Sequence, residues 1–433
     1  MNAPMTSSAL QRQDCIALDA QDPLAMLREQ FVLPGGVIYL DGNSLGALPR
    51  ATAAHVQHVL TEEWGQGLIR SWNMAGWIEL PRRVGDKIAR LVGAAPGELV
   101  VTDSTSINLY KVLGAALAIT RDDAPQRRVI VSERENFPTD LYMAQSLAAQ
   151  HGMRLELVEQ GQALDRLRDD VALLLLTQVN YRSGALYDMA AVTAAAHAAG
   201  ALTIWDLAHS AGAVPVDLNG AQADFAIGCG YKYLNGGPGA PAFVWVHARH
   251  VNRVQQPLSG WHGHAAPFVF TPDYQPAPGI ARYLCGTPTL LSLAALDCGV
   301  DTLLAAEPLG GMQALRRKSV GLSELFIRLV REQLGGHALT LASPLDASRR
   351  GSQVSLAFEG DGYAVMQALI SRGVIGDFRA GDPARGDANL LRFGFTPLYL
   401  RHVDVFDAVR TLREVLDSGI WREARFARKD AVT

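Results

Sequence analysis

Short apolar runs along the chain are each followed by a polar turn and then by a longer segment in which apolar residues recur at helical spacing. The run at 99–102 precedes Asp-Ser-Thr-Ser at 103–106, and these residues are suited to begin a helix. Further runs of this kind lie at 128–132, 173–177 and 202–206. An Ala-rich helix is predicted over 189–199, with Gly200 closing it. Strands that alternate with helices in this way predict a mainly parallel sheet covered by helices, with ligands at the carboxyl ends of its strands.

Three more short strands are predicted outside this core pattern. The segment 37–40 is apolar and ends in an Asp-Gly turn, and a helix is expected from Arg50. Apolar runs at 225–228 and 243–246 predict the other two strands, with a Gly-rich segment lying mostly between them. The Gly-rich segment is therefore expected to connect these two strands.

The pattern changes past about Gly310, which indicates a second, smaller domain. A basic helix through 316–318 is followed by strand-like runs at 353–358 and 390–395. We therefore expect an N-terminal segment of residues 1–50 associated with the small domain, a large domain of residues 51–310, and a small α+β domain of residues 311–433.

Composition narrows the class of partner. The 433 residues carry 39 Lys and Arg against 43 Asp and Glu, a net charge of −4, without a long block of like charges. This balance argues against nucleic acid or an anionic membrane as partner and favours small molecules. The four cysteines lack the dense spacing of a disulfide framework, and neither a secretory leader nor a membrane span is expected. We expect a cytoplasmic protein.

Lysine is rare in this chain, with only five residues, and one of them stands apart. Lys232 lies among glycines and tyrosines after an apolar strand, whereas Lys87, Lys111, Lys318 and Lys429 fit solvated surfaces. A partly desolvated lysine has a lowered pKa and can attack a carbonyl to form a Schiff base. A loop lysine in a Gly-rich turn explains the local sequence equally well.

Asp206 stands at the end of the strand predicted at 202–206, with His209 three residues on. Such an aspartate can cap a helix, contact a ribose or metal, or pair with a protonated pyridine nitrogen. Pyridoxal phosphate requires both a lysine on its aldehyde and a carboxylate at its ring nitrogen. The hydroxyls of Thr105 and Ser106 at a helix N-terminus suit its phosphate, although capping alone also explains them. The order of phosphate site, Asp206 and Lys232, each after a predicted strand, favours the cofactor.

Several segments in this order resemble kynureninases, which are fold-type I pyridoxal-phosphate enzymes of the class V aminotransferase group. The resemblance covers about residues 39 to 399. Its segments are Leu-Asp-Gly-Asn-Ser-Leu-Gly at 40–46, Thr-Ser-Ile-Asn-Leu at 105–109, Phe-Pro-Thr-Asp at 137–140, Asp-Leu-Ala-His at 206–209, Gly-Tyr-Lys-Tyr-Leu-Asn-Gly-Gly-Pro-Gly at 230–239, Trp-His-Gly-His at 261–264 and Arg-Phe-Gly-Phe at 392–395. Each is weakly to moderately specific, and together they are specific. The fold implied is a large domain with a mainly parallel mixed sheet between helices plus a smaller α+β domain.

The resemblance implies roles for residues around pyridoxal 5'-phosphate. Lys232 would form the Schiff base and later move protons, Asp206 would pair with the pyridinium, and Tyr231 would assist at the substrate carbonyl. Tyr231 would also join Thr105 and Ser106 at the cofactor phosphate. The other implied cofactor contacts are Phe137, Pro138, Thr139, Asp140, Thr177 and His209. The implied reaction is hydrolysis of L-kynurenine, together with 3-hydroxykynurenine, to anthranilate or 3-hydroxyanthranilate and L-alanine, in tryptophan degradation.

The resemblance also implies a homodimer with active sites shared between subunits, because Trp261 and Thr287 would reach the cofactor phosphate of the neighbouring chain. Arg392 would clamp the substrate carboxylate. Asn43, Ser44 and Trp72 are candidates for the pocket around the aryl ring and carbonyl. Taken singly, the aromatic residues also fit a core and Arg392 fits a surface charge.

Other sites and functions are less well supported. His262 and His264 form a His-x-His pair without an accompanying Cys or carboxylate cluster, so no metal is expected. Gly228-x-Gly230 is followed by Tyr233 where a dinucleotide motif needs glycine. A cysteine desulfurase or aminotransferase on the same scaffold remains an alternative, although desulfuration needs a reactive, exposed cysteine. A non-catalytic binding protein with this fold is a second alternative.

Overall fold

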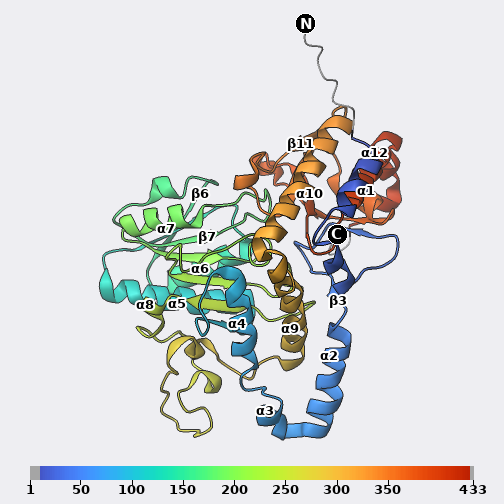
Figure 1. Cartoon of the computed structure of the whole chain (residues 1–433). Helices are drawn as coiled ribbons and strands as arrows, with labels where there is room; N and C mark the ends of the chain where they lie inside the picture. The colour runs from blue at the N-terminus through green and yellow to red at the C-terminus, as the bar shows by residue number, and fades with distance from the viewer. Residues whose placement is uncertain (1–9, 430–433) are drawn as a thin grey trace.

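The computed structural model describes residues 10–429 and is built around one large sheet (Figure 1). The sheet has seven strands in the order β4-β10-β9-β8-β7-β5-β6. They are β4 (Leu99–Val101), β5 (Val129–Glu133), β6 (Arg154–Val158), β7 (Val171–Thr177), β8 (Leu202–Asp206), β9 (Phe225–Gly228) and β10 (Phe243–Val246). Neighbours pair in parallel except for β10, which is antiparallel to both β9 and β4. The predicted mainly parallel mixed sheet is confirmed.

Helices cover both faces of this sheet, and strand β7 shows why. Successive side chains on a strand point to opposite faces, and every residue of β7 is buried. Leu173 and Leu175 belong to the hydrophobic cluster that includes α5 and α6, whereas Leu174 and Leu176 belong to the cluster that includes α4, α7 and α9. These helices are α4 (Leu80–Val92), α5 (Thr105–Asp123), α6 (Pro138–Gln150), α7 (Met189–Ala198) and α9 (Leu290–Leu304).

A second, antiparallel sheet of four strands lies in the C-terminal part, in the order β11-β12-β15-β14. Its strands are β11 (Leu339–Leu341), β12 (Gln353–Phe358), β14 (Asp377–Arg379) and β15 (Asn389–Gly394). The helices of this part are α10 (Gly311–Gln333), α11 (Gly362–Ile370), α12 (His402–Ser418) and α13 (Ala424–Ala427). The long helix α10 runs from beside the large sheet towards α12 (Figure 1).

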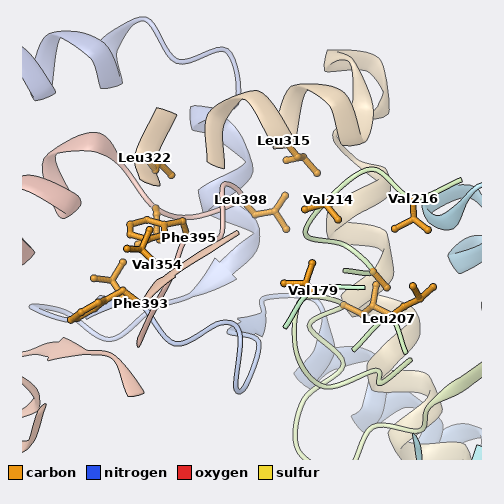
Figure 2. Packing of buried hydrophobic residues seen from close by; sticks show 14 of the residues in the cluster. Val179, Leu207, Val214, Val216, Leu315, Leu322, Val354, Phe393, Phe395 and Leu398 are labelled. Carbon is orange, nitrogen blue, oxygen red and sulfur yellow. The ribbon is translucent and has the colours of Figure 1, made fainter. Parts of the chain in front are cut away.

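One hydrophobic cluster joins the two sheets (Figure 2). Val179 and Leu207 follow strands of the large sheet, Leu315 lies on α10, and Val354 and Phe393 lie on the small sheet. Burying these side chains together stabilises one arrangement of the two sheets, at roughly 25 cal/mol per Å² of apolar surface removed from water. The small sheet is thereby held against the edge of the large sheet where the site lies.

The N-terminal segment packs on the C-terminal part of the chain. Strand β2 (Ile38–Tyr39) pairs in parallel with β13 (Val374–Ile375), and α1 (Arg12–Ala20) packs on α12, where Arg12 pairs with Asp407 at 2.8 Å. The remaining strands and α-helices are β1 (Phe31–Val32), β3 (Leu48–Pro49), α2 (Thr52–His58), α3 (Ser71–Met74) and α8 (Ala248–Val251). The domain boundaries themselves stay a prediction.

The prediction of solvated surfaces is wrong for two of the lysines. Lys111 is fully buried on α5, where its Nζ donates to Asp103 and to the carbonyl of Tyr283 at 2.6 Å. The Lys318 side chain is 7% exposed and pairs with Asp22 at 2.7 Å. Buried amines of this kind need an acceptor from a distant segment. Periodicity in one helix does not reveal such a partner.

Within residues 10–429, no helix is both long and apolar enough to cross a membrane. The expectation about a leader segment also concerns residues 1–9, which lie outside the described residues.

Candidate active site

The site lies at the edge of the large sheet where the parallel strands end. Strand β4 runs in the same direction as the parallel strands, because two successive antiparallel pairings through β10 restore the direction. The carboxyl ends of β4, β5, β7 and β8 therefore meet at this edge, as the sequence predicts. A cavity of about 270 Å³ opens there. Its lining is Ser104, Thr105, Ser106, Phe137, Thr139, Asp140, Thr177, Tyr181, Asp206, Ala208, His209, Tyr231, Lys232, Ala240 and Ala242.

Lys232 is 8% exposed and its amine faces this cavity. Its Nζ lies 2.9 Å from Nε2 of His209 and 5.7 Å from the ring centroids of both Phe137 and Tyr231. Burial, followed by the charge of Lys232, holds the pKa of His209 well below its usual value. The imidazole is therefore neutral, and its Nε2 accepts a hydrogen bond from the Lys232 amine.

Two buried carboxyl groups, Asp140 and Asp206, lie next to each other beside Lys232. Burial raises the pKa of both, and the charge of Asp206 raises the pKa of Asp140 further, well above its usual value. The Lys232 charge acts in the opposite direction on both groups. We infer that the pair shares a proton, with Asp140 as the protonated partner, because two adjacent buried carboxylates repel each other. Asp206 also accepts a hydrogen bond from the backbone N–H of Ala208 at 2.7 Å. Asp206 therefore caps the following turn and lines the cavity at the same time.

The first turn of α5 offers a site for an anion. Ser104 caps the helix by accepting from the backbone N–H of Ile107 at 3.4 Å, and Thr105 and Ser106 follow on the cavity wall. Free backbone N–H groups and the helix dipole favour negative charge at such a position. Asp103, just before the turn, adopts a left-handed backbone conformation with φ 45°. Buried Lys111 and the Thr102 hydroxyl, at 2.9 Å, both donate to its carboxylate and hold it there.

Most of the cofactor residues expected from the sequence come together in this cavity. Those that line it are Thr105, Ser106, Phe137, Thr139, Asp140, Thr177, Asp206, His209, Tyr231 and Lys232. Pro138 lies between two lining residues as the first residue of α6. The clustering arises because each of these residues ends or follows a strand whose carboxyl end lies at the same edge.

Two of the expected residues lie elsewhere on the same chain. Trp261 packs edge-on against Trp72, with ring centroids 5.8 Å apart, and neither residue lines the cavity around Lys232. Thr287 is exposed on the segment that precedes α9. Trp72, Trp261 and Thr287 therefore do not line the cavity around the lysine of their own chain.

Arg392, Ser44 and Asn43 lie behind the cavity wall. Arg392 is 1% exposed, and its Nη2 donates to the Ser44 hydroxyl at 3.2 Å. The side chain of Asn43 is fully buried close to Gly394, and its amide nitrogen and oxygen have no hydrogen-bond partner among the described residues. Their predicted roles in substrate binding stay predictions.

Two residues of the site were not singled out from the sequence. Tyr181 lines the cavity and packs edge-on against Phe137, with ring centroids 5.3 Å apart. The sequence feature that could have identified Tyr181 is its position in the polar turn after β7. Asp377 accepts from Nε of Arg392 at 2.8 Å, but it begins a strand of three residues whose pairing with β15 is not visible in the sequence.

The two histidines of the His-x-His pair have structural partners. His262 stacks on Trp261, and His264 Nδ1 accepts from the backbone N–H of Ala266 at 2.8 Å. No group of three side chains able to hold a metal ion occurs in the described part of the chain.

Comparison with curated proteins gives close relatives along the whole chain. Proteins called kynureninase from Burkholderia pseudomallei and from Pseudomonas fluorescens are 56% and 55% identical over 425 residues, which covers 98% of this chain and 99% of each relative. The chain belongs to the kynureninase family. Residues 315–412 also match the family model described as the kynureninase C-terminal domain.

Solved structures support the fold class of this kynureninase-family chain. An apo cysteine desulfurase from Thermococcus onnurineus has a TM-score of 0.76 at 20% identity and covers 91% of this chain and 98% of its own. A mutant of the cystine C–S lyase C-DES, with glycine covalently linked to its PLP cofactor, has a TM-score of 0.76 at 17% identity over 89% of this chain and 98% of its own. At this identity the likeness shows the fold alone. It confirms the predicted fold-type I architecture.

Proposed function

We propose that this chain is an enzyme that uses pyridoxal 5'-phosphate to hydrolyse L-kynurenine to anthranilate and L-alanine. The observation that carries the proposal is the full-length relationship to kynureninases at 55–56% identity. The same reaction on 3-hydroxykynurenine, and a place in tryptophan degradation, extend the proposal.

The residues of the cavity fit this cofactor. Asp140 Oδ2 and His209 Nδ1 are buried without a hydrogen-bond partner in the described part of the chain, so the protein alone leaves polar groups unsatisfied there. Lys232 would hold the cofactor aldehyde, Asp206 would pair with the ring nitrogen, and the first turn of α5 would bind the phosphate. When bound, pyridoxal phosphate withdraws electrons from the α-carbon of an amino acid.

The protein's own groups supply proton transfer around that carbon. Neutral His209 accepts a hydrogen bond from Lys232 and thereby keeps the amine oriented in the cavity. Burial raises the pKa of Tyr231, so its hydroxyl stays protonated at neutral pH. A protonated phenol that faces the cavity can donate to the substrate carbonyl while water adds, a contribution of roughly 10²–10⁴-fold in rate. Tyr231 is our candidate for that acid.

A homodimer with shared active sites is the second part of the proposal. A group of large apolar side chains is exposed near Trp72 and Trp261. The ring of Trp261 contacts both Trp72 and, at 5.8 Å between ring centroids, Phe268, and so links the segments that carry these two residues. This exposed edge consists of Leu68, Ile69, Met74, Phe268, Val269 and Phe270, each 57–79% exposed. Exposed apolar surface of this kind marks interaction sites. A second copy of the chain bound at this edge would bring Trp261 and Thr287 of the first copy towards Lys232 of the second copy.

The cellular location that we propose is the cytoplasm. All four cysteines, Cys15, Cys229, Cys285 and Cys298, are free thiols in the structure. Unpaired cysteines are typical of proteins that work in a reducing compartment.

Cysteine desulfuration is less well supported by the site. Cys229 is buried, and burial raises the pKa of its thiol, whereas desulfuration needs a reactive thiolate. The direct test of the proposal is to mix purified protein, loaded with pyridoxal phosphate, with L-kynurenine and to follow anthranilate fluorescence. A steady rise supports the proposed reaction, and a flat trace refutes it.

A further inference from the structure

One buried carboxylate, Asp377, binds two arginines at the back of the site. Asp377 and Arg392 lie directly opposite each other on the antiparallel strands β14 and β15. Asp377 Oδ2 accepts from both Nε, at 2.8 Å, and Nη2 of Arg392. The same oxygen lies 3.0 Å from Nη2 of Arg379. Asp377 is 2% exposed, so the three side chains form one fixed group.

The charges of this group do not balance. Arginine side chains carry a permanent positive charge in proteins, and Asp377 supplies one negative charge between Arg379 and Arg392. The other carboxyl group close by is Asp41, whose pKa is raised to about 7 by burial and then by the charge of Asp377. Its negative charge is therefore only partly present at neutral pH. A surplus positive charge in a largely buried place is costly unless an anion neutralises it.

This surplus charge acts on His209, the histidine that contacts Lys232. The positive charges of Arg392 and Arg379 both lower the pKa of His209, after the larger effects of burial and Lys232. Arg392 also donates through Nη1 to the carbonyl of Tyr181, a residue of the cavity lining. An amino acid whose amino group is near Lys232 would therefore have its α-carboxylate directed at the two arginines.

Arg392 alone does not offer enough free N–H groups to bind both oxygens of that carboxylate. A guanidinium binds a carboxylate with two parallel N–H bonds when its fork is free. Here the Nε and Nη2 fork is taken by Asp377, and Nη2 also contacts Ser44. Nη1 also donates to the carbonyl of Tyr181, so Arg392 has little hydrogen-bonding capacity left for a ligand. Arg379, whose side chain is 38% exposed, is the more accessible of the two guanidinium groups.

We propose that Asp377 is a positioning residue that holds Arg392 and Arg379 together as one receptor for the α-carboxylate, with Arg379 as a second carboxylate-binding side chain. The inference rests on the proposed function for the identity of the substrate. The receptor itself requires only the α-carboxylate that any amino acid carries.

The first experiment compares Arg379→Gln with Arg385→Gln. Arg385 lies six residues away, has a side chain 36% exposed, and pairs with Glu159 instead. With L-kynurenine, Arg379→Gln should raise KM about tenfold, the effect of losing a charged hydrogen bond, while kcat changes by less than about twofold. The preference for L-kynurenine over its α-carboxamide should fall by a similar factor. Arg385→Gln should match wild type in both measurements.

A purely structural role would not change the preference for acid over amide. If Arg379→Gln keeps the KM and the preference of wild type, the receptor is refuted. Asp377→Asn should raise KM at least as much as Arg379→Gln, and Asp377→Glu should restore part of the loss by returning the charge. Equal KM values for the Asn and Glu variants would refute the positioning role of Asp377.

A calorimetric titration separates this inference from the proposed function. Loaded wild-type protein should bind L-alanine more tightly than L-alaninamide, and Arg379→Gln should lose that difference. If this result is obtained while wild type fails to turn over L-kynurenine, the receptor stands and the proposed function fails. If L-kynurenine is turned over but Arg379→Gln retains the difference, the proposed function stands and the receptor fails.

Discussion

Nζ of Lys232 lies 2.9 Å from Nε2 of His209, and both side chains are buried. Because the pKa of His209 is well below its usual value, the imidazole stays neutral around pH 7 and adds no second positive charge next to the amine. The lysine is thereby oriented by an uncharged acceptor while a carboxyl pair, Asp140 and Asp206, lies nearby.

Replacing Lys232 by Ala should remove the covalent link to the cofactor and lower anthranilate release by at least about 10³-fold, the scale on which a covalent catalytic residue acts. Borohydride reduction followed by mass spectrometry should fix the cofactor on the wild-type peptide that contains Lys232 and leave the variant unlabelled. Lys87→Ala, on α4, is the matched control and should keep both label and activity. A Lys232→Ala protein that still turned over kynurenine would refute the Schiff-base assignment.

Substrate binding should weaken as the pH rises through about 7. Asp41, with its pKa raised to about 7 by burial and by Asp377, is neutral below that pH and ionised above it. Its negative charge then competes with the substrate carboxylate for Arg392 and Arg379, so KM for L-kynurenine should rise between pH 6 and pH 8, a few-fold by the usual scale of such partly screened charges. Asp41→Asn should flatten this rise, and a variant that keeps the slope would contradict the assignment.

Hybrid dimers test the shared site. If Trp261 completes the neighbouring subunit's site, Lys232→Ala chains and Trp261→Ala chains should each be nearly inactive alone. Mixed by unfolding and refolding together, half of the dimers are hybrids with one intact site, which predicts about a quarter of wild-type activity. Recovery no greater than the sum of the separate variants would show that Trp261 serves its own chain.

The buried carboxylate of Asp224 should contribute strongly to the free energy of unfolding. Although its burial acts in the opposite direction, hydrogen bonds from His197, His250 and Arg249 lower its pKa. A carboxyl whose pKa is lowered on folding stabilises the protein above the pKa of the unfolded state, and this contribution is lost as the pH falls. Asp224→Asn should therefore cost about 3 kcal/mol in urea unfolding at pH 7.

The control for that measurement is Asp170→Asn, which removes a carboxylate that is 39% exposed and paired with Arg166. An exposed pair contributes less than about 1 kcal/mol. Equal losses of stability in the two variants would contradict the central role of Asp224.

Local patterns predicted much of the fold and of the lysine side of the site. The strands Phe225–Gly228 and Phe243–Val246 have the predicted bounds, because uniformly apolar runs between turn residues specify a buried strand. Lys232 and Asp206 meet because both follow strands of one sheet. The helix expected from Arg50 begins at Thr52.

Contacts between distant segments were not predictable in the same way. The burial of Lys111 depends on the carbonyl of Tyr283, and the orientation of Arg392 depends on Asp377 across a strand pair. Hydrophobic periodicity states which face of an element is buried. It does not state which charged group from elsewhere meets that face.

Strand β10 has a consequence for the order in which the protein can assemble. In the large sheet β4 pairs with β10 alone, and the loop that carries Lys232 lies between β9 and β10. The first turn of α5, directly after β4, therefore gains its place in the sheet only when a strand from much later in the chain has arrived. Pairing of such distant segments is slow. The anion site and the lysine loop are thus both completed in one late step of folding. A nascent chain that ends before β10 therefore has neither a complete sheet nor a site that can retain its cofactor.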